Sequence, residues 1–134
     1  MTDSYYEVID DADPSGEKFC ATDLVRSTWS AALQHAGPVS ALLVRALERC
    51  AARDDTRLSR VVIDLLGPVP AEGDLWVRSQ VERPGKQIEL ISAEMLALGP
   101  EGQAPADSPG QRMAAAAARH RRVDPRGRTA AASG

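Results

Sequence analysis

Hydrophobic residues recur over residues 38–53 with the period of an amphipathic helix. The apolar stripe consists of Val39, Leu42, Leu43, Ala46, Leu47 and Cys50, and charged residues occupy the opposite side. We expect Gly37 to be the N-cap and Pro38 the first helical residue, where a missing N–H costs nothing. The pattern therefore predicts one helix over residues 38–53, about 24 Å long at a rise of 1.5 Å per residue.

Alternating apolar and polar positions on both sides of this helix predict β-strands. Residues 5–9 and 19–22 flank a turn signal, so we expect them to pair as a hairpin. Residues 57–66, 74–82 and 87–98 alternate as half-buried strands do. The Arg-Pro-Gly-Lys run at residues 83–86 has the signature of a type II turn. A change of phase in the last of these strands predicts a β-bulge near Ile91.

The remaining segments have no steady period. We expect residues 23–35 to wrap the surface and to deliver Trp29 as an anchor, and residues 99–111 to form a loop. Residues 112–120 contain five consecutive alanines, which favour a helix by propensity. The antiparallel order of the preceding strands instead favours one more strand. We therefore predict a strand here. Residues 124–134 are read as a disordered tail, which leaves residues 1–123 as a single domain.

These elements predict an α+β protein in which one amphipathic helix packs on an antiparallel sheet. With only two Trp, two Tyr and one Phe the core is thin, and exposed sheet edges favour dimerisation. The net charge of −3 argues against nucleic acid as a partner. Cys20 and Cys50 lack metal-ligand spacing and are read as free thiols, and we expect no metal or cofactor. An acidic N-terminus and short apolar runs predict a cytoplasmic protein with no membrane partner.

Several short segments, in linked order, resemble the acyl-CoA thioesterase II-like family. They are residues 21–29 (ATDLVRSTW), 34–38 (QHAGP), 41–48, 61–70 and 81–90. The resemblance implies the N-terminal repeat of a hotdog fold, in which an antiparallel sheet wraps around one long central helix. Family chains usually carry two repeats and place the catalytic Asp, Thr and Gln in the second, so no residue here inherits those roles. The family's His-Gly-Gly before the helix is His35-Ala36-Gly37 in this chain.

Two residues at the predicted helix start are candidates for catalysis. The backbone N–H of Gly37 is our first candidate for an oxyanion donor, since thioester hydrolysis develops negative charge on the carbonyl oxygen and a preorganised N–H there contributes roughly 3 kcal/mol. The alternative is that Gly37 only caps the helix and permits close packing. His35 is a candidate general base, since imidazole titrates near neutral pH, and a structural role is the alternative.

Two carboxylates are further candidates. Asp64 lies in the middle of a predicted strand, where we expect it to be partly buried; it either activates water or pairs with Arg60 or an arginine across an interface. Glu48 lies on the polar side of the predicted helix. In some single-hotdog thioesterases the working carboxylate comes from this helix, whereas an (i, i+3) ion pair with Arg45 is the plainer alternative.

The C-terminal end of the chain is basic. A contact with nucleic acid or with coenzyme A phosphate is one reading, but an acidic total charge and the lack of interleaved aromatic residues favour a solvated tail. The residues concerned are Arg119, Arg121, Arg122, Arg126 and Arg128.

Two functions follow from the resemblance. The first is an acyl-CoA thioesterase-like protein that hydrolyses or binds fatty acyl-CoA thioesters as a homodimer. The alternative is a non-catalytic hotdog half-module that binds acyl-CoA or pairs with a separate second hotdog chain.

Overall fold

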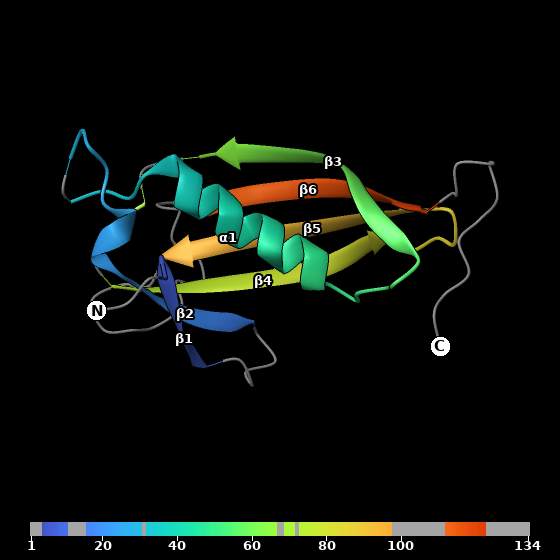
Figure 1. The fold of residues 1–134 in the computed structure, drawn as a ribbon, viewed down its shortest axis with the longest axis horizontal. Coiled ribbons are helices and arrows are strands. Elements are labelled where there is room, and N and C mark those ends of the chain that lie inside the picture. The colour runs from blue at the N-terminus through green and yellow to red at the C-terminus, as the bar shows by residue number, and fades with distance from the viewer. Residues whose placement is uncertain are drawn as a thin grey trace.

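Helix α1 lies across one face of a six-stranded antiparallel sheet (Figure 1). The computed structural model describes residues 4–10, 16–30, 32–66, 69–71, 73–97 and 112–122. Their elements are β1 (Tyr6–Asp10), β2 (Glu17–Ala21), the 3-10 helix η1 (Asp23–Val25), α1 (Ala36–Arg49), β3 (Thr56–Leu65), β4 (Asp74–Arg83), β5 (Ile88–Ala97) and β6 (Arg112–Arg121). No helix in these ranges is both long enough and apolar enough to span a membrane.

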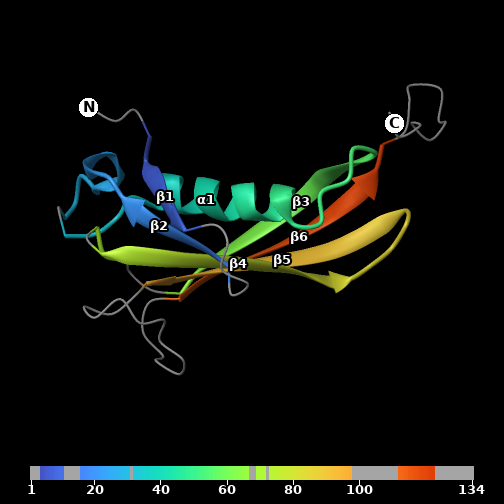
Figure 2. The ribbon, with the colours of Figure 1, turned by 90° about the horizontal axis from the view of Figure 1, so that it is seen from below.

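The strands follow the order β1-β2-β4-β5-β6-β3, so short β1 and ten-residue β3 form the two edges. Figure 2 shows the sheet curling around α1, with β1 and β2 rising on one side and β3 and β6 on the other. This is the hotdog arrangement that the family resemblance implied, and it contains the helix-on-sheet packing that the residue pattern predicted. The predicted loop at residues 99–111 and tail at residues 124–134 lie outside the described residues.

The apolar stripe of the helix forms the centre of the core, as predicted. All six stripe residues are buried, and they pack with Phe19 of β2 and with helix-facing residues of the central strands. Those strand residues are Leu75, Val77, Ile91, Ala93, Met95, Met113, Ala115 and Ala117. Burial of this face, at roughly 25 cal/mol per Å² of apolar surface, holds the helix on the sheet.

The predicted strands are confirmed. Strands β1 and β2 pair antiparallel as a hairpin. The alanine-rich segment is strand β6, not a helix, and it lies between β5 and β3. Small side chains there let α1 approach the sheet closely, which explains why tertiary packing overrides helix propensity in this segment.

The type II turn predicted at residues 83–86 is wrong. That turn requires a positive φ at its third residue, and among the described glycines only Gly16 and Gly73 have one. Gly85 is needed for a different reason: a Cβ there would overlap the carbonyl oxygen of Ile88. The connection between β4 and β5 therefore depends on a close backbone approach.

The β-bulge predicted near Ile91 lies in the neighbouring strand instead. Strand β5 pairs with β6 without interruption from Ile88 to Leu96, whereas the register with β4 shifts between Val81 and Arg83. The apparent change of phase in β5 arises because Glu89, not an apolar residue, occupies a buried position. Its neighbours Ile88 and Leu90 are exposed.

A buried ion pair explains both Glu89 and the end of the helix. Arg119 is 3% exposed and donates from Nε to the Oε2 atom of Glu89 at 2.8 Å. Its Nη1 and Nη2 atoms donate to the carbonyl oxygens of Cys50 (2.7 Å) and Ala51 (3.0 Å). These bonds satisfy the carbonyls of the C-cap residue and of the residue that follows it, directly beyond the last helical turn. The helix ends at Arg49, four residues before its predicted end, and Ala51 adopts a left-handed φ of 43°.

Acid should destabilise the segment between α1 and β3. Asp55 accepts two bonds from Arg53, at 3.2 and 3.1 Å. The hydrogen bond from Arg53, aided by the charges of Arg53 and Arg121, holds the pKa of Asp55 below its ordinary value. A lowered pKa in the folded state means that this stability is present above the unfolded pKa, about 3.9, and is lost as pH falls through the folded value. We expect Asp55→Asn to lose stability at pH 7 and to show a shallower decline below pH 4 in urea titrations.

Candidate functional site

The start of α1 is built around His35, which is the N-cap in place of the predicted Gly37. The backbone of His35 is extended (φ −68°, ψ 142°), and its Nδ1 atom accepts a hydrogen bond from the backbone N–H of Gly37 at 2.8 Å. A Cβ at position 37 would lie 3.1 Å from the imidazole, so glycine allows the ring to approach. Pro38 is the third helical residue, where it supplies no unsatisfied N–H.

Gln34, directly before the cap, fixes the position of His35. Its backbone N–H donates to Val69 (2.7 Å), its Nε2 donates to the Pro70 carbonyl (2.8 Å), and its Oε1 accepts from the hydroxyl of Tyr6 (2.6 Å). Burial raises the pKa of Tyr6, so this hydroxyl remains a donor at physiological pH. The helix start is thus tied to β1 and to the segment after β3.

A hollow of about 290 Å³ opens beside this cap. It is lined by Tyr5, Leu24, His35, Gly37, Pro38 and Ala41. Apolar side chains form most of its wall, and the imidazole of His35 and the N-terminal end of the helix supply the polar groups. An apolar hollow with a few convergent polar groups is the usual form of a small-molecule site.

The hydrogen bond at the cap sets the tautomer of the His35 imidazole. Because Nδ1 of His35 accepts from Gly37, the neutral ring carries its proton on Nε2. Nε2–H is then a donor, suited to a carbonyl oxygen rather than to removing a proton from water. The N–H of Gly37 is engaged by the ring, so an oxyanion contact from Gly37 requires the imidazole to turn away. The catalytic roles of both residues stay predictions.

Replacing His35 separates its capping role from its chemistry. His35→Ala removes the acceptor and should lower the free energy of unfolding by about 1 kcal/mol. His35→Asn supplies a good N-cap acceptor and should retain most of the wild-type stability. Urea denaturation of both variants checks this, and equal losses for the two would show that the cap contributes nothing.

Glu48 lies in a second hollow, of about 410 Å³, near the other end of the helix. The expected ion pair between Glu48 and Arg45 is wrong. Arg45 instead donates to the carboxylate of Glu17 on β2, at 3.1 and 3.2 Å, and its guanidinium lies over the ring of Phe19. Arg45 therefore ties the helix to β2 and leaves Glu48 exposed.

Asp64 lies in a third hollow, of about 530 Å³, on the sheet face opposite α1. The expectation of partial burial is wrong, because Asp64 is exposed. No ion pair joins it to Arg60 within the described ranges. Its neighbours in the hollow include Gln80, Glu82 and Ser92. Hydrogen bonds, first from Ser92 and then from Gln80, lower the pKa of Glu82, so its carboxylate is ionised at neutral pH.

The candidates thus divide among three hollows. The structure brings His35 and Gly37 together, whereas Glu48 lies near the far end of the same helix and Asp64 on the other side of the sheet. Sequence reasoning missed Gln34 and Tyr6, which position the cap. Gln34 could have been found because it directly precedes His35 in the sequence. Tyr6 could not, because it is 28 residues away from Gln34.

Trp29 is not an anchor within its own chain, since it is 95% exposed. Backbone bonds join Ser27 to Leu33 and Leu33 to Ser30 at the base of its loop, and Arg26 and Gln34 form an isolated β-bridge. This closed base holds the tip of the loop away from the core.

The fold and the family are clear from comparisons with known proteins. A curved antiparallel sheet around one central helix defines the hotdog class. Residues 25–118 match the family model described as "Acyl-CoA thioesterase N-terminal domain", and the chain belongs to that family. A search of curated proteins found no significant match.

Solved structures agree with this fold. The PaaI protein of the E. coli phenylacetic acid degradation operon has 18% identity and a TM-score of 0.60, with 87% of this chain and 79% of that one covered. HI0827, a hexameric broad specificity acyl-coenzyme A thioesterase, has 16% identity and a TM-score of 0.57 over 87% and 84% of the two chains. The smu.793 protein of Streptococcus mutans, bound to acetyl CoA, has 10% identity and a TM-score of 0.61 over 91% and 92%.

Proposed function

We propose that this chain binds fatty acyl-CoA thioesters at the start of α1 and hydrolyses them as a homodimer. The observation that carries the proposal is the apolar hollow at the helix N-terminus, with its imidazole donor, in a chain of the acyl-CoA thioesterase N-terminal domain family. The acetyl CoA in smu.793 and the acyl-CoA activity in the name of HI0827 support the ligand class.

The reaction needs stabilisation of the carbonyl oxygen and a directed water. In our proposal Nε2–H of His35 and the positive end of the helix dipole stabilise the oxyanion. The oxygen of water bonds to the thioester carbon, the carbon–sulfur bond breaks, and the sulfur takes up a proton to leave as free thiol. A carboxylate, Asp64 or Glu48, would accept the proton from water. Because neither shares the hollow of His35, it would come from a second copy.

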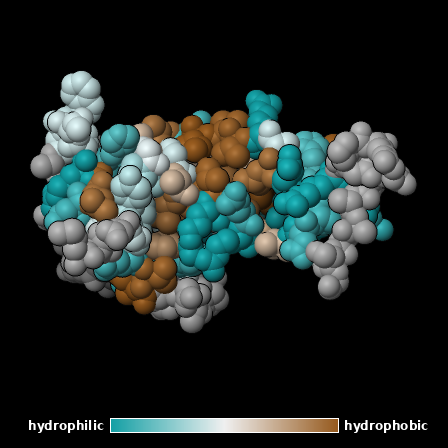
Figure 3. Space-filling model, in the orientation of Figure 1, coloured by the Kyte–Doolittle hydropathy of each residue, from teal (hydrophilic) through white to brown (hydrophobic). Residues whose placement is uncertain are grey.

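Exposed groups on one side of the molecule support a dimer. Strand β3 pairs with β6 on one edge, and the described residues leave its other edge without a partner strand. At the end of β3, Leu65 and Leu66 are 54% and 62% exposed. Figure 3 shows apolar surface where α1 and β3 lie side by side. An open, ten-residue strand edge beside apolar side chains is a ready interface.

The proposed dimer can be tested by replacing Trp29. In our proposal its indole inserts between the two copies, and buried tryptophans are typical interface hot spots that contribute about 2 kcal/mol or more. We expect Trp29→Ser to weaken dimerisation by about 30-fold in sedimentation equilibrium. Val8→Ser, at an exposed apolar position on the opposite edge strand β1, is the matched control and should dimerise as wild type. Unchanged dimerisation of Trp29→Ser would refute this role.

A non-catalytic half-module is the second candidate. It is favoured by the engagement of the Gly37 N–H with His35 and by the distribution of the candidate residues among three hollows. The purified protein would be incubated with acyl-CoAs of several chain lengths while free thiol is followed. Hydrolysis supports the first function. Tight acyl-CoA binding without hydrolysis, or co-purification with a second hotdog chain, supports the second.

A further inference from the structure

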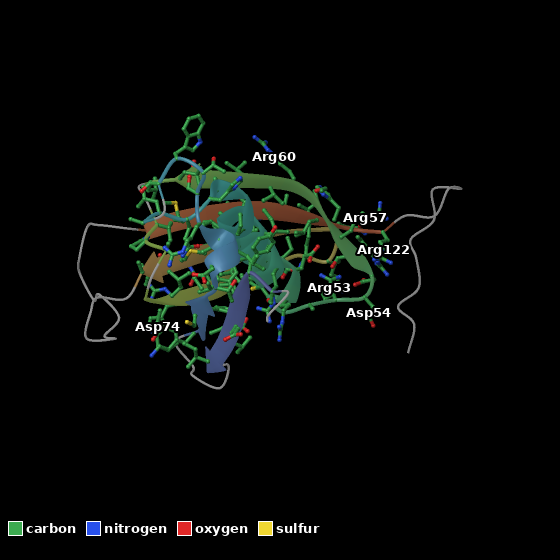
Figure 4. The ribbon with its side chains drawn as sticks, turned by 60° about the vertical axis from the view of Figure 1, so that its left-hand side comes forward. Arg53, Asp54, Arg57, Arg60, Asp74 and Arg122 are labelled. Atoms are coloured by element: carbon green, nitrogen blue, oxygen red, sulfur yellow. The ribbon has the colours of Figure 1, made fainter. Side chains whose placement is uncertain are left out.

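An arginine-rich hollow lies where α1 ends, β3 begins and β6 ends. Its volume of about 410 Å³ is within the range typical of small-molecule sites, roughly 300–1,000 Å³. Its polar lining consists of Glu48, Arg53, Thr56, Arg57, Arg119 and Arg122. Figure 4 shows Arg53, Arg57 and Arg122 gathered at this end of the molecule, while Arg60 stands apart further along β3. Arg119 and Arg122, interpreted from sequence as part of a solvated basic end, therefore line a concave surface, while Arg126 and Arg128 lie outside the described residues.

The four guanidinium groups are not equivalent. Arg119 and Arg53 are held by Glu89 and Asp55 respectively and form the rigid base of the hollow. Arg57 and Arg122 are exposed and have no ion pair to any residue that the structure describes. Two cations at one end of a small hollow repel each other, and the carboxylate of Glu48 offsets only one of them. One positive charge therefore stays without a counter-charge, and an anionic ligand would complete the balance.

We propose that this hollow binds a phosphate-bearing small molecule through Arg57 and Arg122. The planar guanidinium groups donate in pairs to phosphate oxygens, and such charge-assisted bonds are among the strongest that side chains make. Thr56 is not a donor, because its hydroxyl already donates to the carbonyl oxygen of Arg53.

Substitution of Glu48 is expected to strengthen phosphate binding, whereas substitution of the arginines is expected to weaken it. Its carboxylate lines the same hollow and repels an anion. Glu48→Gln removes this repulsion while keeping the shape of the side chain, so it should tighten phosphate binding by about two- to fivefold. A merely structural role of Glu48 predicts no such gain.

Titration calorimetry with inorganic pyrophosphate on the full chain tests the site. We expect saturable binding that weakens as salt is added. Arg57→Ala and Arg122→Ala should each weaken it by about tenfold. Arg60→Ala makes the same change on the same strand outside the hollow, and it should bind as wild type. The proposal is overturned if pyrophosphate does not bind, or if Arg57→Ala and Arg122→Ala bind as tightly as Arg60→Ala.

Competition with coenzyme A identifies the source of the phosphate. Displacement of pyrophosphate by coenzyme A, lost in Arg57→Ala, would assign the hollow to the phosphates of the ligand in our proposed function. Saturable pyrophosphate binding that coenzyme A does not displace would assign it to a separate phosphorylated molecule. Both outcomes support a phosphate site, and neither depends on thiol release. Failure of this inference is therefore distinguishable from failure of the proposed function.

Discussion

Arg119→Leu should lower the free energy of unfolding by about 3–5 kcal/mol, the cost of removing one partner of a buried ion pair. The substitution leaves the carboxylate of Glu89, which is 7% exposed, without its main partner. It also removes the donors to the carbonyl oxygens of Cys50 and Ala51 at the end of α1. Three groups thus lose their hydrogen bonds at once, and urea denaturation measures the sum.

Two further variants separate the parts of this effect. Arg121→Leu, on the same strand, disturbs only a partly exposed contact with Asp55 at 3.5 Å and should cost less than about 1 kcal/mol. The double variant Glu89→Leu, Arg119→Leu removes both charges and should recover part of the loss, because apolar replacement of a buried pair is often neutral. Recovery should be incomplete, since the carbonyl oxygens of Cys50 and Ala51 remain without these donors. A single Arg119→Leu variant as stable as Arg121→Leu would show that the pair is not needed.

His35→Asn should lower kcat for acyl-CoA hydrolysis by about 100-fold with little change in KM. Loss of one preorganised donor to an oxyanion costs roughly 100- to 1,000-fold. The asparagine keeps the cap on Gly37, so the fold and the apolar walls of the hollow should persist. A contact made only in the transition state changes kcat, whereas a contact that also binds the ground state changes KM.

The other described histidine provides the control. His120 lies on β6 beside Ser59, outside the hollow at the helix start. His120→Asn should hydrolyse acyl-CoA at the wild-type rate. If His35→Asn is as active as His120→Asn, the imidazole of His35 has no part in the reaction.

The sequence predicted the fold well where a periodic pattern was tied to burial. The helix stripe from Val39 to Cys50 and the strand assignment of the alanine run both follow from packing one helix on a sheet. The prediction from sequence was wrong where a charged residue is buried. Glu89 faces the core only because Arg119, 30 residues away, pairs with it. No local pattern contains that partner, so β5 was assigned a bulge that it does not have.

The candidate site was predictable only where its residues are close together in the sequence. Residues near the helix start are close in sequence, so His35 and Gly37 were found together, although the cap was assigned to the wrong one. The positions of Asp64 and Glu48 depend on which sheet face and which helix end they occupy. The exposure of Trp29 depends on bonds that close its loop. These are properties of the folded chain that residue spacing does not contain.

The central claim is that the N-terminal end of α1 is a thioesterase site. Its most direct test is the release of free thiol from long-chain acyl-CoA by the purified wild-type protein, followed against a protein-free blank. We expect turnover above the blank that falls by about 100-fold in His35→Asn. A purified protein that binds acyl-CoA but releases no thiol at any chain length would contradict the claim.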